Sequence, residues 1–291
     1  MEVLVNGAYK EVYGTVKSFR TLSSSTATTL NKNWLEAPAS PASLNGKRIV
    51  TTRATMNGKN TRNYSILYDP DKYASLWTAY VLCQDHRGSG SSSNWNKNPQ
   101  IPESEQANVS KAYPSLNGVT YDRGHQIPNA DRNGVSAMQS QTYYWTNSTP
   151  QLASFNQGVW NTLENQIRAA IPESDSLYIV TGPVYQTVGG NETVRTLVNS
   201  SNDSKVIPIP NYYYKVVLKV HRSGGKVTEA SAIGFWFTHE AHSGEDWDSS
   251  TFVKSVDFIE EKTGFNFFAN LPPAVEATAE QNTNWNTFKN F

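Results

Sequence analysis

One strongly periodic segment lies among several strand-like segments, and this combination restricts the fold more than any other feature. Apolar residues between positions 152 and 170 recur every three or four residues, which predicts one amphipathic helix. These residues are Leu152, Phe155, Val159, Leu163, Ile167 and Ala170. Pro150 is suited to the first turn of that helix. A second helix is predicted at Val253–Lys262, ended by Gly264.

Segments around this helix alternate apolar with polar residues or are rich in β-branched and aromatic side chains, and they predict strands. The predicted strands are Lys47–Thr55, Asn63–Tyr68, Ser75–Gln84, Leu177–Thr181, Tyr212–Val220 and Ala230–Thr238. Tyr121 is expected to close another short strand before Asp122, and Gly182-Pro183 and Gly189-Gly190 are expected to be breaks. Many strands, few helices and no internal repeat predict an α+β fold, with a mainly antiparallel sheet core flanked by helices.

The first part of the chain differs in composition from the rest. Residues 1–45 are rich in Ser, Thr, Ala and Asn and alternate only briefly, at Glu2–Val5 and Tyr9–Val16. We therefore expect an irregular N-terminal extension, 1–45, with one or two short strands, followed by a single domain, 46–291. His86–Asn98 is dominated by Gly, Ser and Asn, which predicts a surface loop.

Composition excludes several classes of protein. Aromatic residues make up 12% of the chain, which excludes intrinsic disorder. The 25 basic and 25 acidic residues balance, so net charge gives no argument for nucleic acid or acidic membranes as partners. No apolar run approaches the ~20 residues of a membrane span, and the first residues lack the pattern of a secretory signal. Cys83 is the single cysteine, which excludes an internal disulfide.

The segment Tyr121–Pro128 gathers chemically active side chains around a glycine. His125 could act as a general base beside Arg123, whose permanent charge could stabilise an anion. Taken alone, the four residues Asp122–His125 favour a simpler interpretation, a surface turn with a structural histidine, because short motifs often match by chance.

The predicted helix adds a second group of polar residues. Asn156 and Glu164 lie eight residues apart, which places them within ~80° of each other around a regular helix axis. Asn147 lies just ahead of the helix, where it could also be a capping or turn residue. Amide and carboxylate oxygens are the ligands that Mg²⁺ prefers, and Mg²⁺ keeps several of its waters.

Together these segments resemble the DNA/RNA non-specific endonuclease family, the sugar-non-specific nucleases of the ββα-metal type. The matching segments are Asp122–His125, Asn147–Gln151, Phe155–Glu164, Val180–Tyr185, Ile209–Lys215, Ser255–Glu260 and Thr263–Phe268. The resemblance covers about residues 46–272. It implies a ββα-metal finger at the active site and an Mg²⁺-dependent endonuclease that hydrolyses DNA and RNA with little sequence preference, leaving 5′-phosphate ends.

The resemblance also implies roles for individual residues. His125 would be the general base that activates water. Asn156 would bind the metal directly, with Mn²⁺ able to replace Mg²⁺, and Arg123 would hold the phosphate.

Three further residues would support these groups. Glu164 would hold waters bound to the metal, and Asn147 would orient His125 or a phosphate oxygen. Asp122 would fix the loop through backbone or arginine contacts.

One feature departs from the family pattern. The family often has an arginine just ahead of an aromatic residue before the motif, but here Ser91-Ser92-Ser93 precedes Asn94-Trp95. Arg87 is the nearest cation upstream and could replace it. Between residues 80 and 170, six basic residues balance six acidic ones. We therefore expect weak, strongly salt-sensitive binding to DNA and RNA through phosphate.

Other interpretations remain open. His239-Glu240-Ala241-His242 resembles a zinc hydrolase motif only superficially, because its histidines are three residues apart instead of four, and a polar loop is the simpler interpretation. The same fold could also serve as a binding module without catalysis, and the many aromatic residues could mark a carbohydrate-binding surface. By family analogy we expect secretion or a place in the cell envelope, and an inhibitor protein would be one kind of partner.

Overall fold

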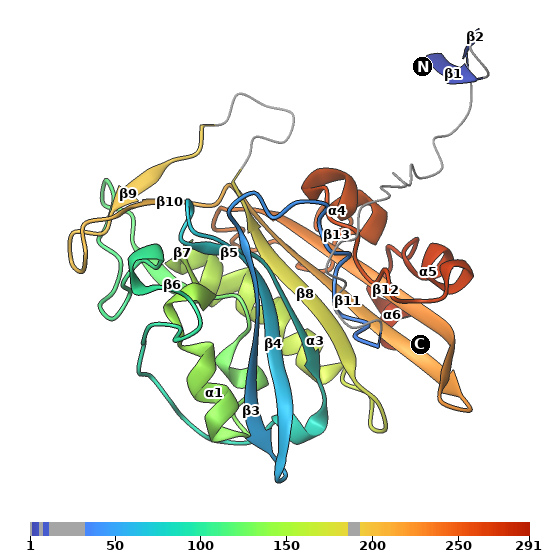
Figure 1. The fold of residues 1–291 in the computed structure, drawn as a ribbon, viewed down its shortest axis with the longest axis horizontal. Coiled ribbons are helices and arrows are strands. Elements are labelled where there is room, and N and C mark those ends of the chain that lie inside the picture. Colours follow the sequence, from blue (N-terminus) through green and yellow to red (C-terminus); the bar gives the residue numbers. More distant parts are fainter. Residues whose placement is uncertain (1, 6–7, 12–32, 186–192) are drawn as a thin grey trace.

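A seven-stranded sheet forms the centre of the protein in the computed structural model, which describes residues 2–5, 8–11, 33–185 and 193–291 (Figure 1). Its strand order is β13-β12-β11-β8-β5-β4-β3, and all neighbouring strands are antiparallel. The strands are β3 (Arg48–Met56), β4 (Lys59–Asp69), β5 (Ala74–Leu82), β8 (Leu177–Val184), β11 (Tyr212–Ser223), β12 (Lys226–Thr238) and β13 (Val253–Lys254). The predicted antiparallel core of an α+β fold is confirmed.

Three two-stranded sheets lie outside this core. They are β1 (Glu2–Val5) with β2 (Ala8–Glu11), β6 (Tyr121–His125) with β7 (Ser148–Leu152), and β9 (Thr196–Val198) with β10 (Val206–Pro208). The short strand predicted at Glu2–Val5 is therefore present. The end of the predicted segment Tyr9–Val16 and the break at Gly189-Gly190 lie outside the described residues.

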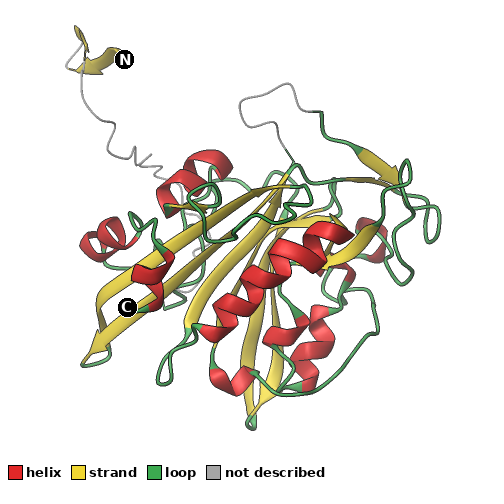
Figure 2. Cartoon of the chain, turned by 180° about the vertical axis from the view of Figure 1, so that it is seen from behind, coloured by secondary structure: helices red, strands yellow, loops and turns green. Residues whose placement is uncertain are grey.

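Helices cover both faces of the central sheet (Figure 2). They are α1 (Ser136–Thr142), α2 (Ala153–Phe155), α3 (Asn161–Ala169), α4 (Val256–Thr263), α5 (Pro273–Ala279) and α6 (Trp285–Lys289). Buried residues of α3 and α6 belong to one hydrophobic cluster, and those of α4 and α5 belong to the other. Within the described part of the chain, every helix is too short or too polar to span a membrane.

Strand β11 shows why the sheet needs a helical layer on each side. Its Tyr213 and Val217 face the cluster that contains Leu163 of α3, whereas Val216 faces the cluster that contains Ile259 of α4. Successive side chains of a strand point to opposite faces, so a strand whose residues are buried on both faces, as in Tyr212–Val220, must be covered twice. Each fully buried aliphatic or aromatic side chain contributes about 1.5–3 kcal/mol, which fixes α3 firmly against the sheet.

The predicted helix start at Pro150 is wrong. Pro150 lies in β7 opposite Arg123, and the helical segment begins only at Ala153. The Pro150 carbonyl accepts a hydrogen bond of 3.2 Å from the hydroxyl of Tyr213, outside the β6–β7 ladder. In an antiparallel ladder the N–H and C=O of one residue point to the same side. An N–H at position 150 would therefore point away from β6, as the carbonyl does, and proline costs the β6–β7 ladder no hydrogen bond.

Three other boundaries differ from the sequence prediction. Tyr121 opens β6 instead of closing a strand. Gly182-Pro183 does not break β8, which continues to Val184. The pairing of β8 with β5 ends at Thr181, so Pro183 removes no hydrogen bond between these two strands. Val253 belongs to β13, so α4 starts three residues later and ends, as predicted, at Gly264 with a positive φ of 72°.

Part of the predicted N-terminal extension packs onto the sheet. Leu35, Glu36 and Ala37 are buried, and the carboxylate of Glu36 pairs with the guanidinium of Arg62. That guanidinium also lies 3.8 Å from the ring centre of Trp34. The division of the chain at residue 46 stays a prediction, but the segment 34–37 shares the core of the larger domain.

Candidate active site

The motif Asp122–His125 lies in strand β6 of a two-stranded finger, not in the surface turn that it suggests in isolation. His125 is paired with Ser148, and Gly124 with Thr149. A Cβ atom on Gly124 would lie 2.3 Å from Oε1 and 2.5 Å from Cβ of Gln151. Only glycine therefore allows β7 to approach β6 at this point.

Asp122 joins this strand to the helical segment that follows β7. Its Oδ2 accepts hydrogen bonds from Nδ2 of Asn156 at 2.9 Å and from Nε2 of Gln157 at 2.8 Å. Because the amide nitrogen of Asn156 is engaged, its Oδ1 is the atom left for a ligand, and it receives no hydrogen bond from the described residues. An amide oxygen beside a carboxylate is the donor set that fits Mg²⁺.

The helical segment that carries Asn156 is kinked, which corrects the prediction of one regular helix. Residues Asn156–Trp160 are wound more widely than an α-helix, and Gly158 within them has non-helical angles of φ −98° and ψ −117°. Regular α-helix resumes at Asn161. The ~80° offset between Asn156 and Glu164 therefore does not apply, although the predicted apolar face is buried against the sheet.

Two aromatic rings enclose the imidazole of His125. Its ring centre lies 4.7 Å from that of Trp95 and 4.9 Å from that of Tyr143. Burial, and then the charge of Arg123, lowers the pKa of His125 from 6.5 to about 3. The ring nitrogen Nε2 is enclosed and has no hydrogen-bond partner among the described residues. A neutral imidazole with one enclosed nitrogen can offer only Nδ1 as a proton acceptor.

Arg123 lies on the same side of β6 as His125. Its Nη1 donates to the carbonyl oxygens of Val109 at 3.1 Å and Ser110 at 2.9 Å. Its Cζ lies 5.2 Å from the ring centre of Trp95. The guanidinium is therefore held by a loop on one side and by an aromatic ring on another.

Asn147 is completely buried, and its amide serves the backbone. Nδ2 donates to the carbonyls of Ile127 at 3.0 Å and Thr142 at 2.8 Å, while Oδ1 accepts from the N–H of Ile127 at 3.0 Å. These contacts fix the chain two residues beyond His125, and they occupy the groups with which Asn147 would reach a phosphate. Its predicted influence on His125 can act only through the backbone.

Glu164 lies in a network of buried charged side chains between α3 and the central sheet. Nη1 of Arg168 lies 3.9 Å from Oε2 of Glu164 and 2.8 Å from Oδ1 of Asp131. Nζ of Lys215 is buried 4.8 Å from the ring centre of Trp160. Burial raises the pKa of Glu164 to about 7, and the charges of Lys215 and Arg168 limit the rise.

Arg87, the candidate replacement for the family arginine, contacts the C-terminal part of α3. Its Nη1 donates to the carbonyl of Arg168 at 3.4 Å, near the C-terminal end of α3. Asn156 precedes the N-terminal end of that helix. Arg87 therefore contacts the helix at the end opposite to the metal-ligand candidate.

His239 contributes to this region in a role that its zinc-like motif did not indicate. Its Nε2 accepts a hydrogen bond of 2.7 Å from the N–H of Leu152, and its Nδ1 donates to the carbonyl of Pro210 at 2.8 Å. Burial lowers its pKa to about 4, so the ring stays neutral and keeps both bonds. It ties the end of β7 to the end of β12, a contact with no signal in the local sequence.

The histidines of the zinc-like motif are thus engaged in hydrogen bonds. Nε2 of His242 lies 2.8 Å from the carbonyl of Thr238, and Nδ1 lies 3.0 Å from Oε1 of Glu245. With the ring nitrogens of His239 also occupied, neither histidine has a nitrogen free for zinc.

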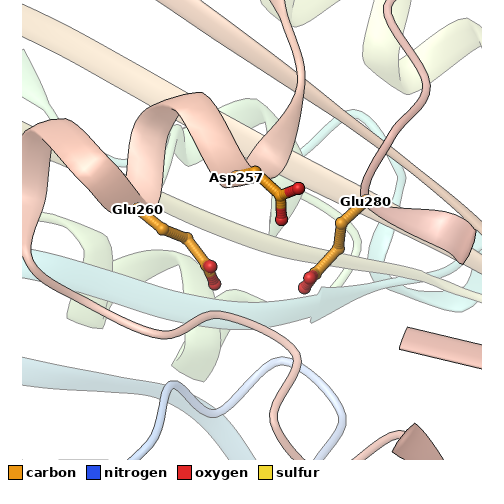
Figure 3. A group of neighbouring side chains, drawn as sticks. All are labelled: Asp257, Glu260 and Glu280. Atoms are coloured by element: carbon orange, nitrogen blue, oxygen red, sulfur yellow. The ribbon is translucent and has the colours of Figure 1, made fainter. Parts of the chain in front are cut away.

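A separate acidic group lies on the opposite face of the sheet. Figure 3 shows the carboxylates of Asp257, Glu260 and Glu280 directed toward one another, and their candidate ligand atoms lie within 4.8 Å. Burial raises the pKa of Glu260 to about 8, and an N–H from Phe267 opposes this rise. Since α4 packs in the cluster opposite to α3, this group is not part of the Asp122–Asn156 site.

Comparisons with known proteins agree with this arrangement. The model of the DNA/RNA non-specific endonuclease family matches residues 45–274. The chain is 31% identical over 211 residues to a nuclease of Serratia marcescens, covering 71% of this chain and 73% of that protein. It is 25% identical to mitochondrial endonuclease G of Bos taurus, covering 73% and 69%.

A solved structure supports the fold. The crystal structure of the EndoG/EndoGI complex, described as showing the mechanism of EndoG inhibition, aligns with a TM-score of 0.58 at 18% identity. The alignment covers 78% of this chain and 89% of that chain. The two proteins therefore share their overall fold.

Proposed function

This chain belongs to the DNA/RNA non-specific endonuclease family and is a nuclease, and we propose that it hydrolyses phosphodiester bonds of both DNA and RNA with Mg²⁺. The observation that carries this proposal is the 2.9 Å hydrogen bond between Asp122 and Asn156. It ties the strand of the general-base candidate to the residue that offers an amide oxygen to a metal.

His125 is the general base in this mechanism. An imidazole that burial keeps neutral can take a proton from the attacking water, a contribution that is typically worth ~10²–10⁴-fold. Because Nε2 is enclosed, Nδ1 is the nitrogen that would receive the proton.

Asn156 would hold the metal through Oδ1, and Glu164 would hold waters of its shell as an ionised carboxylate. A bound Mg²⁺ would supply positive charge that stabilises the negative charge developing on the phosphate, and Mn²⁺ would do the same. Asp122 keeps the amide of Asn156 turned so that its oxygen faces outward.

Arg123 would bind a phosphate oxygen. A guanidinium carries five N–H donors, so the two carbonyl contacts of Arg123 leave others for the substrate. Groups that touch only phosphate and water do not read the base edges, which accounts for weak sequence preference. They also do not need the 2′-hydroxyl, so DNA and RNA are both substrates. Because water attacks the phosphorus and the 3′ oxygen leaves, the products carry 5′-phosphate and 3′-hydroxyl ends.

Cleavage of supercoiled plasmid and of structured RNA, with Mg²⁺ and with EDTA, tests the proposal. His125→Ala should lose at least ~10²-fold in rate, whereas His221→Ala, at an exposed histidine, should not. Near-normal cleavage by His125→Ala would reject the base assignment. Binding of DNA without cleavage in the unaltered protein would favour a binding module instead.

The metal assignment has its own test. Asn156→Ala should need much more Mg²⁺ for half-maximal activity, and a high concentration should restore part of the rate. Asn286→Ala, at an exposed asparagine of α6, is the matched control. An unchanged Mg²⁺ titration in Asn156→Ala would mean that Asn156 is not the ligand.

We also propose secretion or a cell-envelope location, because an indiscriminate nuclease in the cytoplasm would need restraint, for example by an inhibitor protein. Nuclease activity confined to the cell contents after fractionation would contradict the location.

A further inference from the structure

Trp95 is the residue around which the nuclease candidates on β6 are arranged. Its ring lies 4.7 Å from that of His125 and 5.2 Å from that of Tyr143, with the Cζ of Arg123 5.2 Å from its centre. The predicted base and the predicted phosphate ligand therefore share one aromatic neighbour, which comes from the loop where the family arginine is missing.

The backbone beside Trp95 is fixed, although the loop before it is exposed. The N–H of Asn96 donates to the carbonyl of Tyr143 at 3.0 Å, and the N–H of Trp145 donates to the carbonyl of Asn96 at 2.8 Å. This bridge ties the residue next to Trp95 to the segment that carries Tyr143. The indole is thus presented by an anchored backbone and can hold its neighbours in place.

The shared ring constrains both catalytic candidates. His125 has no hydrogen bond at Nε2 to define the rotation of its ring, so the orientation of the imidazole depends on the aromatic walls of Trp95 and Tyr143. Arg123 has two carbonyl anchors on the loop at Val109–Ser110, and the indole limits its movement on another side. Removing the ring would free the imidazole and the guanidinium together.

We propose that Trp95 is a positioning residue of the nuclease site, which sets the imidazole of His125 and the guanidinium of Arg123 relative to each other. The proposal rests on the proposed function, because it needs His125 to be the base. Trp95 would act through these two side chains without itself touching the reacting atoms. Ser91-Ser92-Ser93 stands where the family often has an arginine. Without that second guanidinium the position of Arg123 matters more, and Trp95 would compensate in part by holding Arg123 in place.

The test compares Trp95→Leu and Trp95→Phe with the unaltered protein in plasmid cleavage. Trp95→Leu should lower kcat by 10- to 100-fold, because small displacements of catalytic groups have effects of this size. KM should change less. Trp95→Phe keeps a flat aromatic wall and should recover most of the lost kcat.

A pH profile gives a readout that simple loss of packing would not move. Besides Trp95, the described groups against the His125 ring are Tyr143 and, as the charged one, Arg123. Without the indole the imidazole becomes hydrated and its pKa rises toward the ordinary 6.5, so in Trp95→Leu the kcat/KM profile should fall more steeply on the acid side than titration of Glu164 alone imposes. Tyr143→Leu opens the other wall and should steepen the acid side of the profile in the same way, which keeps the test available if Trp95→Leu folds poorly.

Trp34→Leu is the matched control, because Trp34 has an equivalent contact with Arg62 but lies outside the finger. Its kcat should be within twofold of that of the unaltered protein, and its kcat/KM profile should keep the same shape. If Trp95→Leu matches Trp34→Leu in both measurements while His125→Ala is inactive, Trp95 is not a positioning residue, although the proposed function stands. If His125→Ala is itself active, the failure belongs to the proposed function.

Discussion

At the scale of single residues, burial shifts the two titratable groups of the site in opposite directions. It lowers the pKa of His125 to about 3 and raises that of Glu164 to about 7. The imidazole is therefore neutral, which is the form that a general base needs, throughout the neutral and mildly acidic range. The carboxylate of Glu164 is instead about half protonated near neutrality, so it is the group that limits activity as the pH falls.

Glu164→Gln should consequently change the shape of the activity profile. Activity of the unaltered protein should fall by up to about tenfold per pH unit below the pKa of about 7, because protonation removes the carboxylate that would hold the metal-bound waters. The variant should be less active at pH 8 but flat between pH 5.5 and 8.5. Steady-state cleavage at saturating Mg²⁺ measures this.

Glu229→Gln, at an exposed carboxyl, serves as the control and should keep the unaltered profile. A decline that persists in Glu164→Gln would assign the acid limb to another group. His125 could not be that group if its pKa is about 3.

At the scale of elements, the finger depends on residues that lie far away in the sequence. Two strands alone are at best marginally stable in water. Here β7 is tied to the end of β12 through His239, and Tyr213 of β11 donates to the carbonyl of Pro150. The central sheet thus supplies the rigidity that an isolated two-stranded ribbon lacks, and it helps to fix Asn156, which lies four residues beyond Leu152 at the end of β7.

His239→Phe tests this connection while keeping an aromatic ring in place. The N–H of Leu152 would lose its acceptor, which should cost about 1–3 kcal/mol of unfolding free energy. Activity at low Mg²⁺ should fall more than activity at saturating Mg²⁺, because the displaced segment leads into Asn156. Urea denaturation and a Mg²⁺ titration measure the two effects.

The control for this variant is His221→Ala, which removes an exposed histidine and should alter stability by less than about 0.5 kcal/mol. Equal stability of His239→Phe and the unaltered protein would show that the finger does not depend on this bond.

At the scale of the whole molecule, the sheet separates two regions with different chemistry. The face covered by α3 carries the finger and the buried network around Glu164, whereas the face covered by α4 carries the acidic group at Glu260. The segment 34–37 completes the latter face, because Leu35 belongs to the same hydrophobic cluster as α4. This segment precedes the start of the family match at residue 45.

A chain that begins at Lys47 should therefore be less stable than one that begins at Asn33. The shorter chain loses the burial of Leu35, worth about 1.5–3 kcal/mol, and leaves Arg62 without Glu36. Urea unfolding of the two truncated proteins gives the difference. Equal midpoints would show that residues 34–37 add nothing to the stability of the domain.

The parts of the fold that could be predicted are those with local signals. Alternation located β3 and β4, the three-to-four spacing of apolar residues located the buried face of α3, and Gly264 marked the end of α4. Pro150 was misplaced because a proline suits a helix start and an unpaired strand position equally well. The pairing with Arg123 of β6 and the contact with Tyr213, 63 residues away, decide between them.

The candidate site shows the same division. A short motif and its spacing to Asn156 were visible in the sequence, as was the departure before Trp95. His239 and Lys215 were not, because their importance comes from contacts between strands that are distant in the chain. Asn147 was expected to orient His125 or a phosphate oxygen, and its amide forms hydrogen bonds with the backbone of Ile127 and Thr142.

The kink at Gly158 has a consequence for insertions and deletions in this protein. The kink lies between Asn156 and Glu164. Residues Asn156–Trp160 form one turn that is wider than an α-helical turn, and regular α-helix begins at Asn161. Losing one amino acid there would convert the wide turn into a regular α-helical one, so Asn156 would lose its present position beside Asp122. A gap of the same size in the tip of the β11–β12 hairpin would disturb only solvent-facing backbone. Length variation among functional homologues should therefore avoid positions 156–164, even where side-chain identity drifts.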